Sequence, residues 1–117
     1  NLSDASGHEA MQRLLAMDPR PDGVFCYNDP TAMGAMKAIL EAGLRVPEDI
    51  AVVGAGNVNY AGLLRVPLSS IDQHSDDIGE RAAKLALSLV DAKTPVRPRT
   101  VLLEPDLVVR ASSSRGA

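Results

Sequence analysis

Residues 24–36 read VFCYNDPTAMGAM, a short apolar run that passes directly into a helix start. The run Val24–Tyr27 contains several residues that favour β-structure and follows a turn, so it predicts a buried strand. Asp29 is a plausible N-cap, and Pro30 suits the first position of a helix. The apolar residues that follow recur at helical spacing. This stretch therefore predicts a strand that is followed at once by a helix.

The segments on either side repeat the same kind of unit. Upstream, Ser6 and Glu9 have capping-box spacing at the start of a helix that continues to Leu15. Downstream, Gly43 stands where the left-handed C-cap of the second helix is expected, and Ile50–Val53 predicts a second buried strand. Helices and strands that alternate with short links are typical of a parallel sheet with right-handed crossovers.

The second half of the chain predicts one long helix between extended segments. Ser75 is a candidate cap for this helix, whose apolar stripe comprises Ile78, Ala82, Leu85, Ala86 and Leu89. Around it we expect a helical turn within 60–68, an extended segment at 69–73, a linker at 94–99 and strands at 101–103 and 107–109.

Composition narrows the classes of function. The chain has 117 residues, of which 45% are apolar, so a packed core is available. The net charge of −3 argues against a general phosphate-binding surface, so any DNA contact is expected to lie elsewhere. The sequence contains no run of about 18 apolar residues, so it predicts no membrane span. Cys26 is the single cysteine, which excludes an internal disulfide and fits a reducing compartment.

No pattern of residues points to catalysis, a metal or a cofactor. His8 and His74 lack partners at metal-ligand spacing, so we expect surface histidines and no metal site. No nucleophile–base arrangement is evident, and residues 54–57 lack the third glycine of a dinucleotide fingerprint. The sequence therefore favours a binding protein over an enzyme, with no cofactor.

Two loops are candidates for binding a small ligand. Tyr27–Asp29 follows the first predicted strand, and Ala55–Tyr60 follows the second. Open α/β sheets bind ligands at the carboxyl ends of their strands, so side chains from both loops can meet in one cleft. Amide side chains suit a polyol, because each offers donors and an acceptor.

Four segments, in this order, resemble the LacI/GalR family of bacterial transcription regulators, and together they span nearly the whole chain. They are PDGVFCYND at 21–29 with the helix start at 32–35, EAGLRVPEDIAVVG at 41–54, PLSSIDQ at 67–73 and LVVRAS at 107–112. The resemblance implies an α/β fold, a Rossmann-like parallel sheet flanked by helices, of the periplasmic binding protein type I-like class. It covers only the C-terminal portion of the effector-binding domain.

The resemblance also implies how the chain is divided. Residues 1–68 and 104–112 are expected to form the C-terminal subdomain, and 74–102 to belong to the N-terminal subdomain of the intact fold. The DNA-binding head is absent from residues 1–117. Family members bind a small, sugar-like effector between the two subdomains and switch operator affinity as cytoplasmic homodimers. Because the long helix would lack its own subdomain here, we expect either a dimer or a rearranged helix.

The same resemblance nominates four effector-binding residues, each with a structural alternative. Asn28 matches an effector-binding residue of the family, or is a turn amide bonded to local backbone. Asp29 contacts the ligand or caps the helix. Asn57 lines the cleft, as Asn59 could, or belongs to an Asn-rich turn. Gln73 binds the ligand or the backbone between subdomains.

One segment departs from the family pattern. After the second strand the family usually carries an aromatic and two acidic residues, where this chain has Ala55, Gly56 and Asn57. Glycine cannot hold ligand hydroxyls, so the departure argues against an ordinary hexose and suggests an anionic or less hydroxylated ligand.

Three other functions compete with the regulator. A periplasmic sugar-binding protein of an ABC transporter shares the fold and the Asn-Asp signature, although the Val-Pro-Glu-Asp segment favours the regulator. An unrelated enzyme on a doubly wound sheet and a bare interaction domain are weaker alternatives, since fold alone does not define function.

Overall fold

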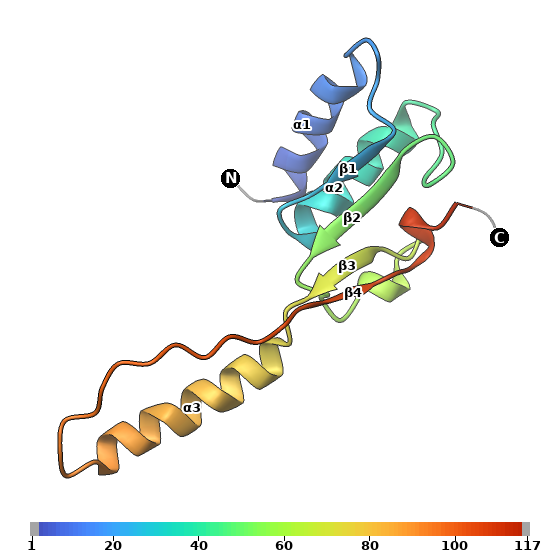
Figure 1. Cartoon of the computed structure of the whole chain (residues 1–117). Coiled ribbons are helices and arrows are strands. Elements are labelled where there is room, and N and C mark those ends of the chain that lie inside the picture. The colour runs from blue at the N-terminus through green and yellow to red at the C-terminus, as the bar shows by residue number, and fades with distance from the viewer. Residues whose placement is uncertain (1–2, 116–117) are drawn as a thin grey trace.

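A computed structural model describes residues 3–115 of the chain, which form a mixed α/β structure (Figure 1). The strands are β1 (Gly23–Phe25), β2 (Ala51–Ala55), β3 (Ser69–Asp72) and β4 (Asp106–Val108). The helices are α1 (Asp4–Leu15), α2 (Asp29–Glu41) and α3 (Ser75–Asp91), with short 3-10 turns η1 (Ala61–Leu63) and η2 (Ala111–Ser113).

The four strands form one sheet in the order β1-β2-β3-β4. β1 pairs parallel with β2, and β2 pairs parallel with β3, as the alternation of strands and helices predicts. β4 runs antiparallel to β3, with Ser70 opposite Val108. The carboxyl ends of the three parallel strands therefore lie at one edge of the sheet, as expected for a Rossmann-like fold.

Helices α1 and α2 contact each other directly through their backbones. A Cβ on Gly34 would lie 1.7 Å from the carbonyl oxygen of Asp4, and one on Gly7 would lie 2.1 Å from that of Thr31. Only glycine allows this approach. Beneath the helices lies an aliphatic core, whose fully buried members include Met11, Ile39, Ile50, Val52 and Leu68.

The helix caps lie near the predicted positions, but on other residues. Ser3 caps α1 by accepting from the Ser6 amide at 3.3 Å, and Asn28 caps α2 through Oδ1 and the Thr31 amide at 2.9 Å. The predicted caps Ser6, Asp29 and Ser75 are therefore wrong. Each stands inside the first turn, where short polar residues are common, so composition alone does not fix which of them is the cap. α3 begins after His74, whose side chain makes no capping hydrogen bond.

The predicted C-cap of α2 is confirmed. Gly43 has a φ of +78°, its amide donates to the Leu40 carbonyl at 3.0 Å, and the Leu44 amide donates to Ile39 at 3.2 Å. These two bonds form a Schellman motif, which closes the helix before β2.

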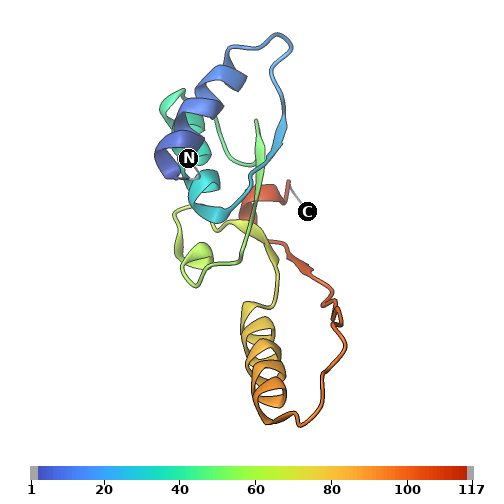
Figure 2. The ribbon, with the colours of Figure 1, turned by 90° about the vertical axis from the view of Figure 1, so that its left-hand side faces the viewer.

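The prediction that Val24–Tyr27 is buried holds for Cys26 and in part for Val24, and is wrong for Phe25 and Tyr27, because α1 and α2 cover only one face of the sheet (Figure 2). β1 is an edge strand, and Phe25 and Tyr27 are 63% and 70% exposed. The strand predicted at 101–103 is absent, whereas the one predicted at 107–109 is observed as β4, one residue earlier.

Helix α3 projects away from the sheet, and residues 92–105 return beside it to β4 (Figures 1 and 2). We call residues 75–105 the α3 unit and the remaining described residues the body. No residue of α3 is buried, so its apolar stripe is solvent-accessible. The helix is not rearranged onto the body; the dimer and the assignment of 74–102 to another subdomain stay predictions.

Within residues 3–115, no helix is long and apolar enough to span a membrane.

Candidate ligand site at the carboxyl edge of the sheet

A polar hollow of about 500 Å³ lies where β2 and β3 end and α3 begins. Its lining comes from the loop after β2, the end of β3, the residue before α3 and the first turn of α3: Gly56, Asn57, Asn59, Asp72, His74, Ser75, Asp76 and Asp77. Two apolar grooves, one along α3 and one between α2 and residues 64–66, lie away from this edge. The polar hollow is the cavity that joins hydrogen-bonding side chains to the carboxyl ends of parallel strands.

Asp29 supports the hollow from behind. The side chain is fully buried; one carboxylate oxygen accepts from the Val58 amide at 2.8 Å and the other from the Ser70 hydroxyl at 2.7 Å. A Cβ on Gly54 would lie 2.3 Å from this carboxylate, so glycine makes room for it in β2. Asp29 is not part of the lining, and it fastens the start of α2 to the loop after β2 and to β3.

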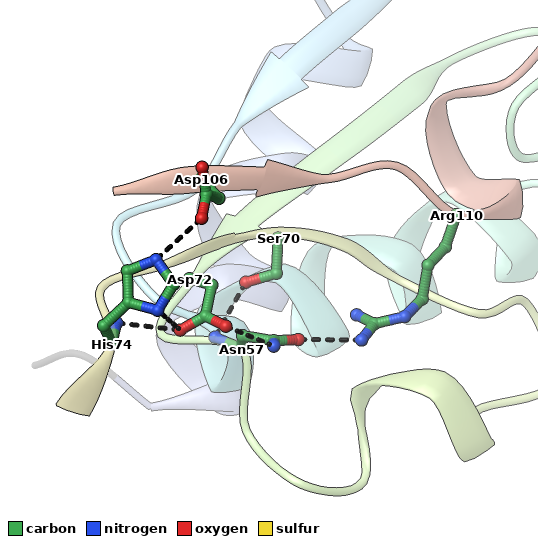
Figure 3. Close-up of polar contacts among 6 residues, drawn as sticks. All are labelled: Asn57, Ser70, Asp72, His74, Asp106 and Arg110. Atoms are coloured by element: carbon green, nitrogen blue, oxygen red, sulfur yellow. Dashed lines mark hydrogen bonds and ion pairs between the residues drawn. The ribbon is translucent and has the colours of Figure 1, made fainter. Parts of the chain in front are cut away.

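Asn57 lines the hollow and also holds the loop in place (Figure 3). The residue has a φ of +50°, a left-handed conformation that asparagine tolerates better than most residues. Its amide Nδ2 donates to Asp72 at 3.3 Å, and its Oδ1 accepts from Arg110 at 2.8 Å. Arg110 also donates to the Leu68 carbonyl at 2.7 Å. The Asn57 amide is therefore fixed in orientation between an acid and a base.

His74 connects β3 to β4 at the rim of the hollow (Figure 3). Its Nε2 lies 2.7 Å from a carboxylate oxygen of Asp106, and its Nδ1 lies 3.9 Å from Asp72. The hydrogen bond to Asp106, together with the negative charges of Asp72, Asp106 and Asp77, raises the pKa of His74. The pKa of Asp72 is lowered, first by the backbone amide of His74 and then by the side chain of Asn57.

The structure brings only Asn57 of the four nominated residues into the lining. Asn28 caps α2 and is half-buried, so the local backbone interaction weighed for it is present. Gln73 is exposed between the lining residues Asp72 and His74. Sequence reasoning missed the roles of His74 and Arg110. The acids on either side of His74 in the sequence, Asp72 and Asp76-Asp77, were a signal for its role. No such signal exists for Arg110, because only the fold brings it to the loop after β2.

Reactive and metal-binding groups are scarce in the part of the chain described. Within residues 3–115, no group of three or more histidine, cysteine, aspartate or glutamate side chains could hold a metal ion. Cys26 is buried, and burial raises the pKa of its thiol to about 11, so the thiol stays protonated near neutral pH.

Comparison with known proteins identifies the fold family. The periplasmic binding protein-like domain family matches residues 2–113. The chain belongs to this family. A curated relative, the HTH-type transcriptional repressor PurR of Mannheimia succiniciproducens, is 43% identical over 91% of this chain. The matched region is 31% of that repressor, so the chain spans about a third of the curated relatives it matches.

Solved structures of LacI-type regulators have the same fold. One from Bifidobacterium animalis subsp. lactis is 32% identical, with a TM-score of 0.89 over 97% of this chain and 40% of the regulator. Another, from an Arthrobacter species in complex with lactose, is 31% identical, with a TM-score of 0.85 over 96% of this chain and 42% of its own. The resemblance to LacI/GalR regulators is thereby confirmed, and the chain matches a portion of their periplasmic binding protein-like domain.

Proposed function

We propose that this chain is the effector-sensing portion of a LacI-type transcription regulator. A small effector binds in the polar hollow and changes how the body and the α3 unit are held together. DNA is contacted through a head outside residues 1–117, and the protein acts as a cytoplasmic homodimer. The observation that carries the proposal is the position of the hollow, at the carboxyl ends of parallel strands and at the start of the α3 unit.

The chemistry of the lining favours a neutral, hydroxylated ligand. Amide, hydroxyl and carboxylate groups hydrogen-bond to the hydroxyls of a sugar or sugar derivative. An anion would face Asp72, Asp76 and Asp77, with His74 as the one possible cation in the lining. This arrangement argues against the anionic effector suggested by the loss of acidic residues at 55–57, since carboxylates from the start of α3 and from β3 stand nearby. The lactose complex of a relative supports the same ligand class.

A ligand in the hollow would touch both parts of the molecule. Asn57 and Asn59 belong to the body, whereas Asp76 and Asp77 belong to the α3 unit. A ligand that bridges two such parts favours the arrangement in which it contacts both. In a dimer, a change in that arrangement would alter the spacing of two DNA-binding heads, on which operator affinity depends.

Calorimetric titration of the whole protein tests the site. The ligands are hexoses, pentoses and disaccharides, with sugar phosphates as the anionic counterpart. We expect saturable binding of a neutral sugar, weakened about tenfold or more by Asn59→Ala or Ser75→Ala, because each removes a polar side chain that lines the hollow and could hydrogen-bond to the ligand. Glu9→Gln, on the exposed face of α1, is the control and should bind normally. Binding of sugar phosphates alone, or loss of binding in none of the hollow variants, would contradict the proposal.

Asn28 needs a variant that separates its two roles. Asn28→Ser retains a side-chain oxygen able to cap α2, but removes the amide. If Asn28 contacts the effector, this variant keeps the stability of the wild type and loses affinity. Unchanged affinity would leave Asn28 with its capping role alone.

The transport-receptor alternative is weaker, because the relatives named above are transcriptional regulators. It predicts sugar binding without any effect on DNA.

A further inference from the structure

The chain leaves the body once and returns once, and these two crossings lie side by side (Figures 1 and 2). The outgoing crossing runs from Asp72 at the end of β3 to Ser75 at the start of α3. The returning crossing leads into Asp106 at the start of β4, which pairs with Asp72 in the sheet. Contacts between the crossings therefore influence how the α3 unit is oriented relative to the body.

His74 makes a side-chain contact between the two crossings. Its Nε2 lies 2.7 Å from Oδ2 of Asp106, and its backbone amide donates to Oδ1 of Asp72 at 2.8 Å. The residue has a φ of +56° and stands directly before α3. A left-handed histidine costs conformational energy, so this position depends on the contacts that surrounding groups make with it.

Both ring nitrogens of His74 face carboxylates. Nε2 is hydrogen-bonded to Asp106, and Nδ1 lies 3.9 Å from Asp72. A neutral imidazole carries one N–H, so its other nitrogen presents a lone pair to a carboxylate oxygen. The imidazolium carries two N–H groups and attracts both acids. The geometry of this pocket therefore suits the charged ring better than the neutral one.

The charged groups that surround the ring come from three elements. Asp72 lies at the end of β3, Asp106 at the start of β4, and Asp77 in the first turn of α3. Arg110 acts on Asp72 with the opposite charge, and its guanidinium bonds to Asn57 and to the Leu68 carbonyl. Among the residues described, the charged groups that act on His74 are thus all acids, contributed by β3, β4 and α3.

We propose that His74 and Asp106 form a proton-dependent latch between the two crossings, which holds the α3 unit in one orientation while His74 is charged. The latch is closed below the pKa of His74 and is released as the pH rises through that pKa. Because that pKa is raised above its usual value of about 6.5, the charged form extends toward neutral pH. A change in pH across that pKa then shifts the balance between held and released α3 units.

The latch itself stands on the crossing geometry; only its consequence rests on the proposed function. If the α3 unit transmits effector binding to DNA, operator affinity will depend on pH through His74. Protonation of His74 then favours one DNA-binding state, and by linkage DNA binding in that state raises the proton affinity of His74.

Two measurements on the whole protein test the latch without effector or DNA. The first is an NMR titration of the His74 ring, in which Asp106→Asn should lower the pKa of His74. The second is amide hydrogen exchange at residues 73–75 and 105–108, at about pH 5.5 and about pH 8.5, on either side of the ordinary histidine pKa of about 6.5. After correction for the intrinsic effect of pH, exchange should be slower at the lower pH.

Two latch variants sharpen the result. Asp106→Asn should remove most of the difference in corrected exchange between the two pH values. His74→Gln has no titrating ring and should remove that difference entirely. Asp106 is exposed, so its substitution leaves the core intact.

A matched pair in the body provides the control. His8 Nε2 lies 3.1 Å from Oε2 of Glu41, between α1 and α2. Glu41→Gln also breaks a histidine–carboxylate pair, and should leave exchange at the crossings unchanged. The latch is overturned if Asp106→Asn leaves the pKa of His74 where it was. It is equally overturned if that pKa falls while exchange at the crossings stays the same, or if Glu41→Gln has the same effect as Asp106→Asn.

Discussion

The body and the α3 unit each contain a helix with an apolar face, but only the helix of the body buries that face. α2 has 13 residues and buries seven of them, including Ala32, Ala35 and Ile39. α3 has 17 residues with a clear apolar stripe, and buries none. An amphipathic pattern specifies a helix and one apolar face, but burial depends on a second surface for that face to pack on. The sheet supplies such a surface for α2, whereas α3 points away from it (Figure 1).

The largest difference should come from truncating an apolar side chain in each helix. Ile39 is fully buried in α2, whereas Leu87 is 65% exposed in α3. In the 117-residue chain, Ile39→Ala should lower the free energy of unfolding by about 2–5 kcal/mol, because it leaves a cavity. Leu87→Ala should change it by less than about 0.5 kcal/mol. Urea denaturation measures both values, and equal losses would show that α3 is packed in solution.

Two aspartates near helix starts should differ almost as clearly. Asp29 is buried and accepts from Val58 and Ser70, whereas Asp77 is an exposed residue in the first turn of α3. Asp29→Asn should cost about 1.5–3 kcal/mol, since the amide nitrogen that replaces one carboxylate oxygen cannot accept the hydrogen bond which that oxygen receives. Asp77→Asn should cost no more than about 1 kcal/mol, the worth of a charge at a helix start. The same denaturation experiment measures both, and a small effect at Asp29 would contradict its supporting role.

Two glycines should respond with opposite signs to the same substitution. Gly43 has a φ of +78° at the end of α2, and a methyl group added there would meet no atom within 4 Å. Gly43→Ala should therefore cost about 1 kcal/mol through backbone strain alone. Gly79 lies inside α3 with similar open space, so Gly79→Ala should stabilise the helix by about 0.5–1 kcal/mol. Helical content by circular dichroism should rise for Gly79→Ala; a fall would mean that this position is not helical in solution.

The smallest effect should be a dependence on pH of the protection of amides at the two crossings from hydrogen exchange. Asp72 has a lowered pKa, so its contribution is present above its unfolded value of about 3.9 and is lost as the pH falls through the folded pKa. His74 has a raised pKa, so its contribution is full below about 6.5 and is lost as the pH rises through the folded pKa.

The crossings should therefore be most ordered between about pH 4 and about pH 6.5, where Asp72 is charged and His74 is protonated. Hydrogen exchange across a pH series measures this, with the β1–β2 region of the body as an internal reference. A maximum of protection above that window would contradict the sign of the His74 shift, and a maximum below it would contradict the sign of the Asp72 shift.

The sequence predicted the elements that depend on local patterns. The order of helices and strands, the parallel pairing of β1 to β3 and the left-handed Gly43 all follow from periodicity, short links and one glycine. The caps were wrong by one to three residues, because Ser, Asp and Asn stand both at the cap and inside the first turn of α1 and α2, whereas at α3 the cap position is held by His74. Burial was wrong for Phe25, since a strand cannot show whether both faces of its sheet are covered.

The candidate site was predictable only in outline. The rule that ligands lie at the carboxyl ends of strands placed Asn57 in the hollow. The burial of Asp29 depends on Gly54 and Ser70, and the orientation of Asn57 depends on Arg110, all of which are distant in sequence. The sequence predicts no partner for His74, because Asp106 lies beyond the whole α3 unit in the chain.

Fluorescence anisotropy of the whole protein on DNA that flanks its own gene tests the central claim most directly. The titration is made with and without the sugar that binds in calorimetry. We predict that the sugar changes DNA affinity by about 5–150-fold, the range of ordinary allosteric coupling, and that Asn59→Ala reduces this change. A sugar that binds in the hollow but leaves DNA affinity the same, or a whole protein that does not bind this DNA, would contradict a regulator whose body senses an effector.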